Sequence, residues 1–135
     1  MKLDHIGIAV KDLEGAVRFY KDVLGLELED VEEVPEENVK VAMFRVGDTY
    51  IELLQGITQD SAISKFIEKR GEGIHHIAIR VDNVDKFVED LKSKGAVLVY
   101  DKSKLVSRGS RKINFIHPKS TSGVLLELVE RVGHE

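Results

Sequence analysis

The sequence predicts an α+β fold in which one module, a strand followed by a helix and three more strands (βαβββ), occurs twice in tandem. Two repeated segments carry this prediction. Residues 4–10 (DHIGIAV) recur as residues 75–81 (HHIAIRV), which places His5 over His76. Residues 50–54 (YIELL) recur as residues 125–129 (LLELV), which places Glu52 over Glu127. We therefore expect one domain over residues 1–135, with modules 1–70 and 71–135 contributing to a curved mixed sheet.

Each predicted module opens with a strand and continues into a helix. The first helix follows Asp12 and the second follows Asn83, and both residue types cap helix N-termini through a side-chain oxygen. Apolar residues then recur at helical spacing. Gly25 and Gly95 stand where a left-handed residue often ends a helix. These signals place one helix after the opening strand of each module.

Three predicted strands complete each module, because β-branched and aromatic residues dominate short runs between turn residues. They are expected at residues 26–33, 39–46 and 49–54 in the first module, and at residues 97–100, 112–116 and 124–129 in the second. A short amphipathic helix is expected at residues 61–69, between the two halves.

Composition narrows the classes of function. The chain has no cysteine, so disulfides and thiolate ligands are excluded and any metal must be held by nitrogen and oxygen atoms. The net charge of -4 gives no sign of a nucleic-acid partner, which normally requires a clustered basic excess. No apolar run approaches the ~20 residues of a membrane helix, and no signal-peptide pattern precedes the first strand. We expect a cytoplasmic protein that contacts no membrane.

Four polar residues occupy strand positions where apolar side chains are expected. By the alternation of side chains along a strand, His5 and His76 each share a face with small residues, which leaves room for a ligand. Glu52 and Glu127 each interrupt a run of Leu, Ile, Val and Tyr, and a buried carboxylate needs a cation, a proton or dense hydrogen bonding. If the modules pack with pseudo-twofold symmetry, these four residues surround one ion. Two imidazoles and two carboxylates suit Co²⁺, Mn²⁺, Ni²⁺, Zn²⁺ or Mg²⁺ and leave coordination positions open for catalysis.

The three other histidines are weaker candidates. His75 points to the face opposite His76, and we interpret it as structural or as a support for the site. His117 precedes Pro118 at a strand end, where a turn role is expected. His134 falls in the C-terminal tail.

These residues resemble the vicinal oxygen chelate superfamily, which includes glyoxalase I, extradiol dioxygenases, antibiotic-resistance proteins and methylmalonyl-CoA epimerases. The resemblance covers nearly the whole chain and is most specific toward the epimerase family. It rests on residues 4–10, 51–54 (IELL), 60–63 (DSAI), 73–78 (GIHHIA), 117–120 (HPKS) and 123–128 (GVLLEL).

The resemblance implies a set of roles. His5, Glu52, His76 and Glu127 take the positions of the metal ligands, Glu52 standing where some members have Gln, and Glu127 is also the counterpart of a catalytic base. The implied reaction is metal-dependent interconversion of (R)- and (S)-methylmalonyl-CoA by proton abstraction and return at C2 through an enediolate. An acyl-CoA substrate, a divalent ion with Co²⁺ first among those named above, and a homodimer are implied with it.

One position departs from the pattern of some epimerases. They carry a second glutamate on the strand before the Glu52 strand, where this chain has Val41. Candidates for the second acid/base are Glu52, a water on the metal, or a residue of a neighbouring loop.

Three alternative functions remain open at this point. A glyoxalase I-like lactoylglutathione lyase would use similar ligands on a hemithioacetal, although the His117-Pro118-Lys119 stretch favours the epimerase. A metal-free small-molecule-binding protein of the same fold typically lacks the four ligands. A metal that only joins the two modules would bind without turnover.

Overall fold

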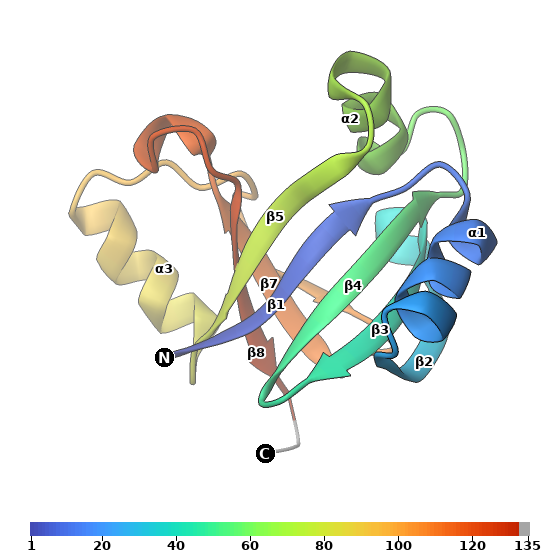
Figure 1. The fold of residues 1–135 in the computed structure, drawn as a ribbon. Helices are drawn as coiled ribbons and strands as arrows, with labels where there is room; N and C mark the ends of the chain where they lie inside the picture. The colour runs from blue at the N-terminus through green and yellow to red at the C-terminus, as the bar shows by residue number, and fades with distance from the viewer. Residues whose placement is uncertain (133–135) are drawn as a thin grey trace. The chain divides into compact units, whose positions relative to one another are not determined.

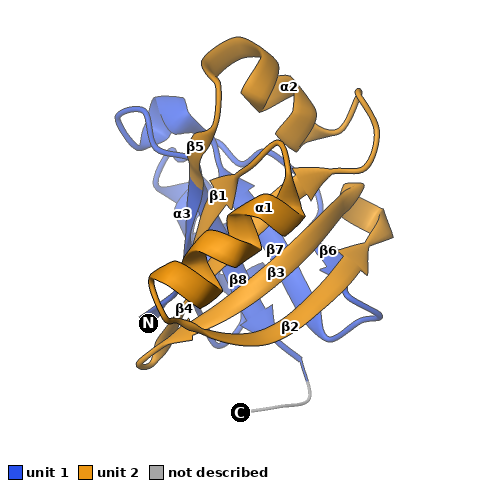
Figure 2. Ribbon diagram, turned by 45° about the vertical axis from the view of Figure 1, so that its right-hand side comes forward, with its two compact units in different colours: residues 1–4, 76–135 blue, residues 5–75 orange. Residues whose placement is uncertain are grey.

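The computed structural model describes residues 1–132, and it confirms the α+β class and the two βαβββ modules (Figure 1). The chain forms two compact units (Figure 2). Unit 2 is residues 5–75. Unit 1 is residues 76–135 together with residues 1–4, so the chain leaves unit 1 directly after Asp4 and returns to it at His76.

Unit 2 contains four strands in the spatial order β2-β3-β4-β1. The strands are β1 (Lys2–Ala9, whose first residues count with unit 1), β2 (Glu27–Val34), β3 (Val39–Val46) and β4 (Thr49–Gly56). β4 pairs with β1 in parallel and with β3 antiparallel. The helical elements are α1 (Leu13–Arg18), its continuation as the π-helix η1 (Phe19–Val23), the 3₁₀ turn η2 (Pro35–Glu37) and α2 (Ala62–Arg70).

Unit 1 repeats this arrangement with the spatial order β5-β8-β7-β6. Its strands are β5 (Gly73–Arg80), β6 (Lys104–Val106), β7 (Arg111–Ile116) and β8 (Leu126–Arg131). β8 pairs with β5 in parallel and with β7 antiparallel, as β4 does with β1 and β3. The helical elements are α3 (Val84–Ser93) and the 3₁₀ turn η3 (Pro118–Ser120).

Each unit packs its long helix on one face of its own sheet. In unit 2 the buried cluster is Val10, Leu13, Ala42, Phe44 and Leu53. In unit 1 it is Val81, Val84, Val88, Ile116 and Leu128. Because side chains alternate along a strand, the apolar residues of β4 and β8 that contact the helix leave Glu52 and Glu127 on the other face of each sheet.

The strand predicted at residues 97–100 is wrong. Only Leu98 makes a β-bridge there, to Ile116, and the strand that follows α3 in the chain is β6 instead. The buried side chain of Asn114 explains the break: its Oδ1 accepts from the Tyr100 backbone N–H at 3.1 Å, and its Nδ2 donates to the Tyr100 carbonyl at 3.2 Å. A side chain therefore takes the place of the backbone ladder at Tyr100. The other predicted strands and the helix at residues 61–69 are present, with ends shifted by two residues or fewer.

The two predicted helix caps have different outcomes. Asn83 accepts from the Lys86 N–H at 3.1 Å, as expected of a capping side chain. Asp12 occupies the cap position of α1 but makes no side-chain cap bond. Gly25 and Gly95 have φ of +87° and +94°, so both helical segments end in left-handed glycines as predicted. Among residues 1–132, no helix is long and apolar enough to cross a membrane.

Candidate active site

In unit 2, His5 and Glu52 form a close pair between parallel strands. Register on β1 and β4 places Gly7 beside Glu52, and Gly7 has no side chain to occupy the space above the carboxylate. His5 lies two residues earlier on β1, on the same face as Gly7. Its Nδ1 is 3.4 Å from Glu52 Oε2. The glycine thus lets the imidazole and the carboxylate meet.

In unit 1, His76 and Glu127 form the equivalent pair. Register on β5 and β8 places Ala78 beside Glu127, so a small residue again stands two positions after the histidine. His76 Nε2 is 3.0 Å from Glu127 Oε1. The four residues predicted from the repeat are therefore brought together as two pairs, one in each unit.

All four side chains are removed from water. The exposed fractions are 1% for His5, 3% for Glu52, 6% for His76 and 5% for Glu127. Burying a carboxylate is costly unless a cation or strong hydrogen bonds compensate it. One neighbouring imidazole offers a single donor, which meets only part of a carboxylate's hydrogen-bonding capacity. Each pair is therefore a place where a bound cation would relieve an electrostatic cost.

The donor atoms of each pair also fit a shared divalent ion. Two ligands that bind at ~2.1 Å and subtend 90–110° lie about 3.0–3.4 Å apart. The measured nitrogen–oxygen separations of 3.0 Å and 3.4 Å lie in that range. Imidazole nitrogen and carboxylate oxygen are ligands that Mn²⁺, Co²⁺, Ni²⁺ and Zn²⁺ accept. Each imidazole–carboxylate pair is thus suited to contribute two ligands to such an ion.

The surroundings of the two pairs differ. In unit 1, Phe115 stands opposite Glu127 in register, and its ring meets the His76 imidazole edge-on at 5.9 Å between centroids. In unit 2 the residue opposite Glu52 is Met43, a flexible aliphatic side chain. An aromatic ring therefore packs against the His76 imidazole in unit 1, whereas a methionine occupies the equivalent position in unit 2.

Val41 lies on the same face of unit 2 as Glu52. It is buried on β3, where it pairs with Leu54 on β4 and with Glu32 on β2. The position that carries a second glutamate in some epimerases is thus aliphatic here. Among the side chains that β3 and β4 place on this face, Glu52 is the carboxylate.

Two strand residues that cap the helices were missed from the sequence. The first N–H of α1, on Leu13, donates to Gln55 Oε1 at 2.7 Å. The first N–H of α3, on Val84, donates to Glu130 Oε1 at 2.9 Å. Gln55 and Glu130 each follow the site glutamate of their strand by three residues, so the repeat offset could have revealed them. These bonds join each helix to the strand that carries the site carboxylate.

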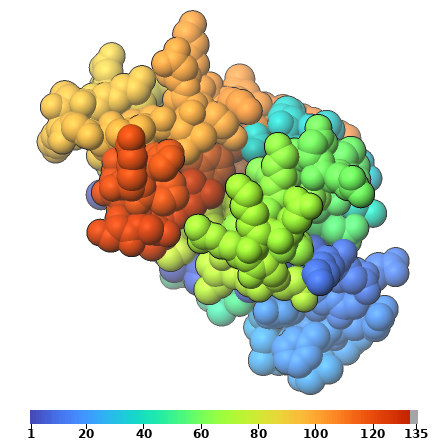
Figure 3. Space-filling view, turned by 90° about the horizontal axis from the view of Figure 1, so that it is seen from above, coloured from blue at the N-terminus to red at the C-terminus, as the bar shows by residue number. Residues whose placement is uncertain are grey.

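The other histidines follow two of the sequence interpretations. His117 caps η3 by accepting from the Lys119 N–H on its Nδ1 at 3.1 Å, which confirms a turn role. The segment that contains η3 lies on the molecular surface (orange-red, Figure 3). His75 packs edge-on against Phe66 at 5.0 Å between ring centroids, a structural contact. His134 lies outside the described residues.

An ion pair in unit 1 had no signal in the sequence. Asp4 is buried and accepts from Arg131 at both oxygens, 3.1 Å from Nε and 2.8 Å from Nη2. The partners are 127 positions apart, and neither belongs to a local motif that would connect them.

Comparisons with known proteins show the family of the chain. Residues 4–115 match the family model of the Glyoxalase/Bleomycin resistance protein/Dioxygenase superfamily. The mitochondrial methylmalonyl-CoA epimerase of Homo sapiens is 41% identical over 128 residues, which is 94% of this chain and 72% of that protein. A solved structure of a Streptomyces coelicolor methylmalonyl-CoA epimerase variant in complex with 2-nitronate-propionyl-CoA is 39% identical, with a TM-score of 0.93 and coverage of 100% and 97% of the two chains.

A second solved structure is a methylmalonyl-CoA epimerase in complex with methylmalonyl-CoA and NH₄⁺. It is 39% identical, with a TM-score of 0.92, and the match covers 99% of this chain and 96% of that one. The chain therefore belongs to the methylmalonyl-CoA epimerase family of the Glyoxalase/Bleomycin resistance protein/Dioxygenase superfamily.

Proposed function

We propose that this chain interconverts (R)- and (S)-methylmalonyl-CoA, using a divalent metal ion held by His5, Glu52, His76 and Glu127. The observation that carries the proposal is the pair of buried imidazole–carboxylate contacts at equivalent positions of the two units. Two epimerase relatives are bound in solved structures to methylmalonyl-CoA or to 2-nitronate-propionyl-CoA, which supports the substrate class.

The reaction moves one proton at C2 of the acyl group. When bound, the divalent ion supplies Lewis acidity toward the substrate's carboxylate and thioester oxygens and makes the C2 hydrogen acidic. Glu127 takes that proton on a carboxylate oxygen, and the substrate becomes an enediolate. A second acid, for which Glu52 is the carboxylate tested in the Discussion, gives a proton to the opposite face of C2 and yields the other epimer; exchange with water then restores both groups. A well-placed general base of this kind contributes roughly 100-fold to 10,000-fold in rate.

The burial of the site also favours this chemistry. The carboxylates lie where little water competes for the proton or for the charge that develops on the substrate. The small residues Gly7 and Ala78 beside the two glutamates place no bulky side chain over either carboxylate. These features suit a reaction that builds negative charge next to a fixed cation.

The decisive experiment is proton exchange at C2 of methylmalonyl-CoA in deuterated water, followed by NMR. We expect washout of the C2 proton and epimerisation with Co²⁺-loaded protein, and loss of both after chelation, with recovery when Co²⁺ is restored. Absence of washout with every divalent ion, in protein that still binds the ion, would contradict the epimerase proposal.

The ligand set has its own test, which does not depend on turnover. His5→Ala and His76→Ala each remove one proposed nitrogen ligand and should weaken Co²⁺ binding by at least about tenfold. His117→Ala is the matched control, because that imidazole caps a surface turn. Equal Co²⁺ affinity in all three variants would contradict the proposed ligands.

The alternatives predict other results in the same assays. A lactoylglutathione lyase would isomerise the hemithioacetal of methylglyoxal and glutathione faster than it epimerises methylmalonyl-CoA. A metal that only joins the modules would bind tightly while no C2 proton exchanges. A metal-free binding protein would take up no Co²⁺ at micromolar concentration.

The proposal includes the identity of the metal ion and the assembly state of the protein. We expect Co²⁺ to give the highest turnover in a series with Mn²⁺, Ni²⁺, Zn²⁺ and Mg²⁺, measured at equal site occupancy. We expect a homodimer, which sedimentation equilibrium would establish from its mass of twice 15.2 kDa.

A further inference from the structure

Both proposed histidine ligands stand directly after a point where the chain changes units. Residues 1–4 belong to unit 1 and His5 opens unit 2, while residues 5–75 belong to unit 2 and His76 reopens unit 1. The residue that precedes each histidine, Asp4 or His75, therefore belongs to the unit that the chain is leaving.

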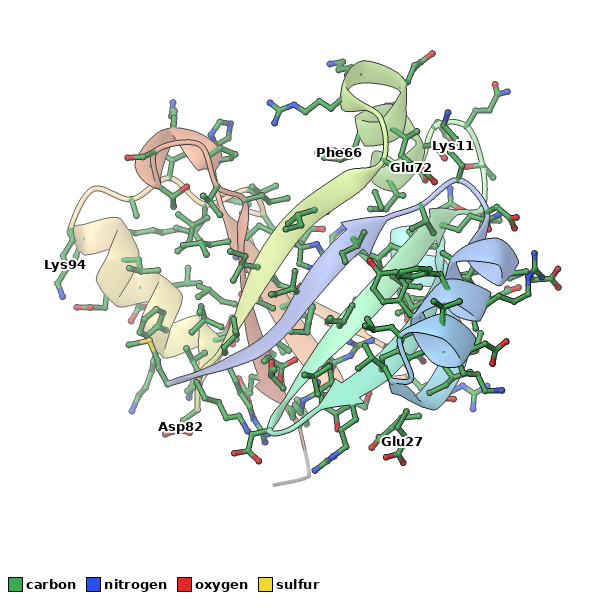
Figure 4. All side chains as sticks on the ribbon, viewed as in Figure 1. Lys11, Glu27, Phe66, Glu72, Asp82 and Lys94 are labelled. Carbon is green, nitrogen blue, oxygen red and sulfur yellow. The ribbon has the colours of Figure 1, made fainter. Side chains whose placement is uncertain are left out.

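Each of these preceding residues is anchored to the unit that the chain leaves. Asp4 is held in unit 1 by Arg131 on β8, through the two contacts of 3.1 Å and 2.8 Å. His75 is held in unit 2 by Phe66 of α2, whose ring it meets edge-on (Figure 4 labels Phe66). The anchors are chemically unlike, so they are not leftovers of one duplicated contact.

The Asp4–Arg131 anchor is the stronger of the two. The Asp4 carboxylate is 3% exposed, and the Arg131 side chain is 21% exposed. Two-point binding by a guanidinium fixes the direction of a carboxylate as well as its distance. Buried ion pairs of this kind are often no more stabilising than apolar packing, and their best-attested use is to set register.

Arg131 lies on the strand that carries one of the proposed metal ligands. Arg131 lies four residues after Glu127 on β8, and by strand alternation the two side chains share a face. Asp4 is bonded covalently to His5. The ion pair thus connects the backbone of one proposed ligand to the strand that carries another.

We propose that the Asp4–Arg131 ion pair is a positioning element for the metal centre, because it fixes Asp4, the residue bonded to His5, to strand β8 before the ion binds. The inference rests on the ligand set given under the proposed function. It predicts that the affinity for metal, in addition to the stability of the fold, depends on an ion pair that does not itself touch the ion.

The test compares two arginine substitutions of the same kind. Arg131→Met removes the anchor and keeps a long aliphatic side chain. Arg45→Met is the control, because Arg45 also lies on a strand and pairs with a glutamate, Glu29, but in an exposed ion pair of unit 2. For each variant we would measure the dissociation constant for Co²⁺, the visible absorption bands of bound Co²⁺ and the unfolding midpoint without metal.

We expect Arg131→Met to weaken Co²⁺ binding by about tenfold or more and to shift the absorption bands, since residues that orient ligands typically carry such effects. Arg45→Met should leave both unchanged. Arg131→Lys keeps the charge but loses the two-point contact, and we expect an intermediate affinity. If Arg131→Met does not fold, Asp4→Asn and Arg131→Lys provide the same comparison.

One result would overturn the inference: a lower unfolding midpoint with Co²⁺ affinity and absorption bands equal to those of the unsubstituted protein. The ion pair would then serve the fold alone. This outcome is separable from failure of the proposed function, because the unsubstituted protein could bind Co²⁺ through the same residues and still not epimerise methylmalonyl-CoA. If it bound no divalent ion at all, the ligand set and this inference would both be wrong.

Discussion

The two units have the same arrangement in the parallel strand pair that carries the site residues, and they differ in their outer strands. In both, a parallel strand pair places a small residue beside a glutamate and a histidine two positions earlier. The outer strand of unit 2, β2, runs for eight residues, whereas residues 97–100 of unit 1 form only one bridge before the three-residue β6. The sheet of a duplicated module can therefore change at its edge while its parallel pair remains the same.

The two modules share the chemistry of the site residues but differ in the side chains that support them. The shared part is the imidazole–carboxylate contact and the helix cap from Gln55 or Glu130. The specific part is Phe115 against His76 in one unit and Met43 with Val41 near Glu52 in the other. Substitutions at equivalent positions should show how much each module contributes to epimerisation and to the stability of the fold.

The largest effect is expected from Glu127→Gln. This change removes the proposed base but keeps an oxygen that can bind a metal ion. We expect epimerisation to fall by about 100-fold to 10,000-fold, because general base catalysis is lost. NMR of C2 exchange measures it, and Glu89→Gln, an exposed position on α3 of the same unit, is the control. Retention of full activity in Glu127→Gln would remove this residue from the mechanism.

Glu52→Gln tests whether the first module also supplies a proton. Since Val41 and Met43 are the β3 neighbours on this face, Glu52 is the carboxylate positioned to act there. We expect Co²⁺ to bind, one epimer to exchange its C2 proton through Glu127, and epimerisation to fall by about 100-fold. The measurement is C2 exchange with each epimer separately.

Epimerisation at the normal rate in Glu52→Gln would contradict the role of Glu52 as the second acid/base. Glu32→Gln is the matched control, because Glu32 lies on the neighbouring strand β2 and pairs there with Val41 of β3. Loss of epimerisation in the Glu32 variant instead would assign the second proton to β2.

The aromatic contacts of Phe115 are found in one module only, and their contribution to stability can be measured by comparing Phe115→Leu with Met43→Leu. Phe115 makes edge-on ring contacts with His76 and with Tyr100, at 5.9 Å and 5.7 Å between centroids. Each such contact contributes about 0.5–1.5 kcal/mol, so we expect Phe115→Leu to lower the free energy of unfolding by about 1–3 kcal/mol. Met43→Leu, nearly equal in volume, should change it by less than about 1.5 kcal/mol. Urea denaturation measures both, and equal effects would mean that the aromatic contacts contribute nothing specific.

The smallest effect is expected at the surface ion pair of Lys112 and Asp85, 2.9 Å apart in unit 1. The Lys112 ammonium lowers the pKa of Asp85 below its ordinary 3.8, and Asp85 raises the pKa of Lys112 above 10.5. Stability from the pair is therefore present between those values. It is lost as pH falls through the lowered Asp85 pKa or rises through the raised Lys112 pKa.

Lys112→Met should thus cost about 0.5 kcal/mol near neutral pH, because exposed pairs are screened by solvent. The free energy of unfolding of this variant should approach that of the unsubstituted protein at the acid and alkaline limits. Lys40→Met, at the equivalent position of β3, is the control. A pH-independent difference would mean that the cost comes from lost packing of the lysine stem.

Some features of the fold were predictable because their signals are local or repeated. His5, Glu52, His76 and Glu127 stood out because polar residues recurred at equivalent places in apolar strands. Asn83, Gly25 and Gly95 act through the conformation of their own turn, and so their roles follow from residue type. The repeat also predicts which residue of one module corresponds to which of the other.

What the sequence determined by itself is the duplicated α+β module, its helix ends and the recurrence of one histidine and one glutamate in each module, because short-range preferences and a repeat encode them. Only the tertiary structure decided the break at Tyr100, the bond from Gln55 to α1 and the Asp4–Arg131 anchor. Each of these depends on a side chain reaching a group far away in the chain. Such contacts are chosen by which strands lie together and in what register, and no pattern of neighbouring residues specifies that.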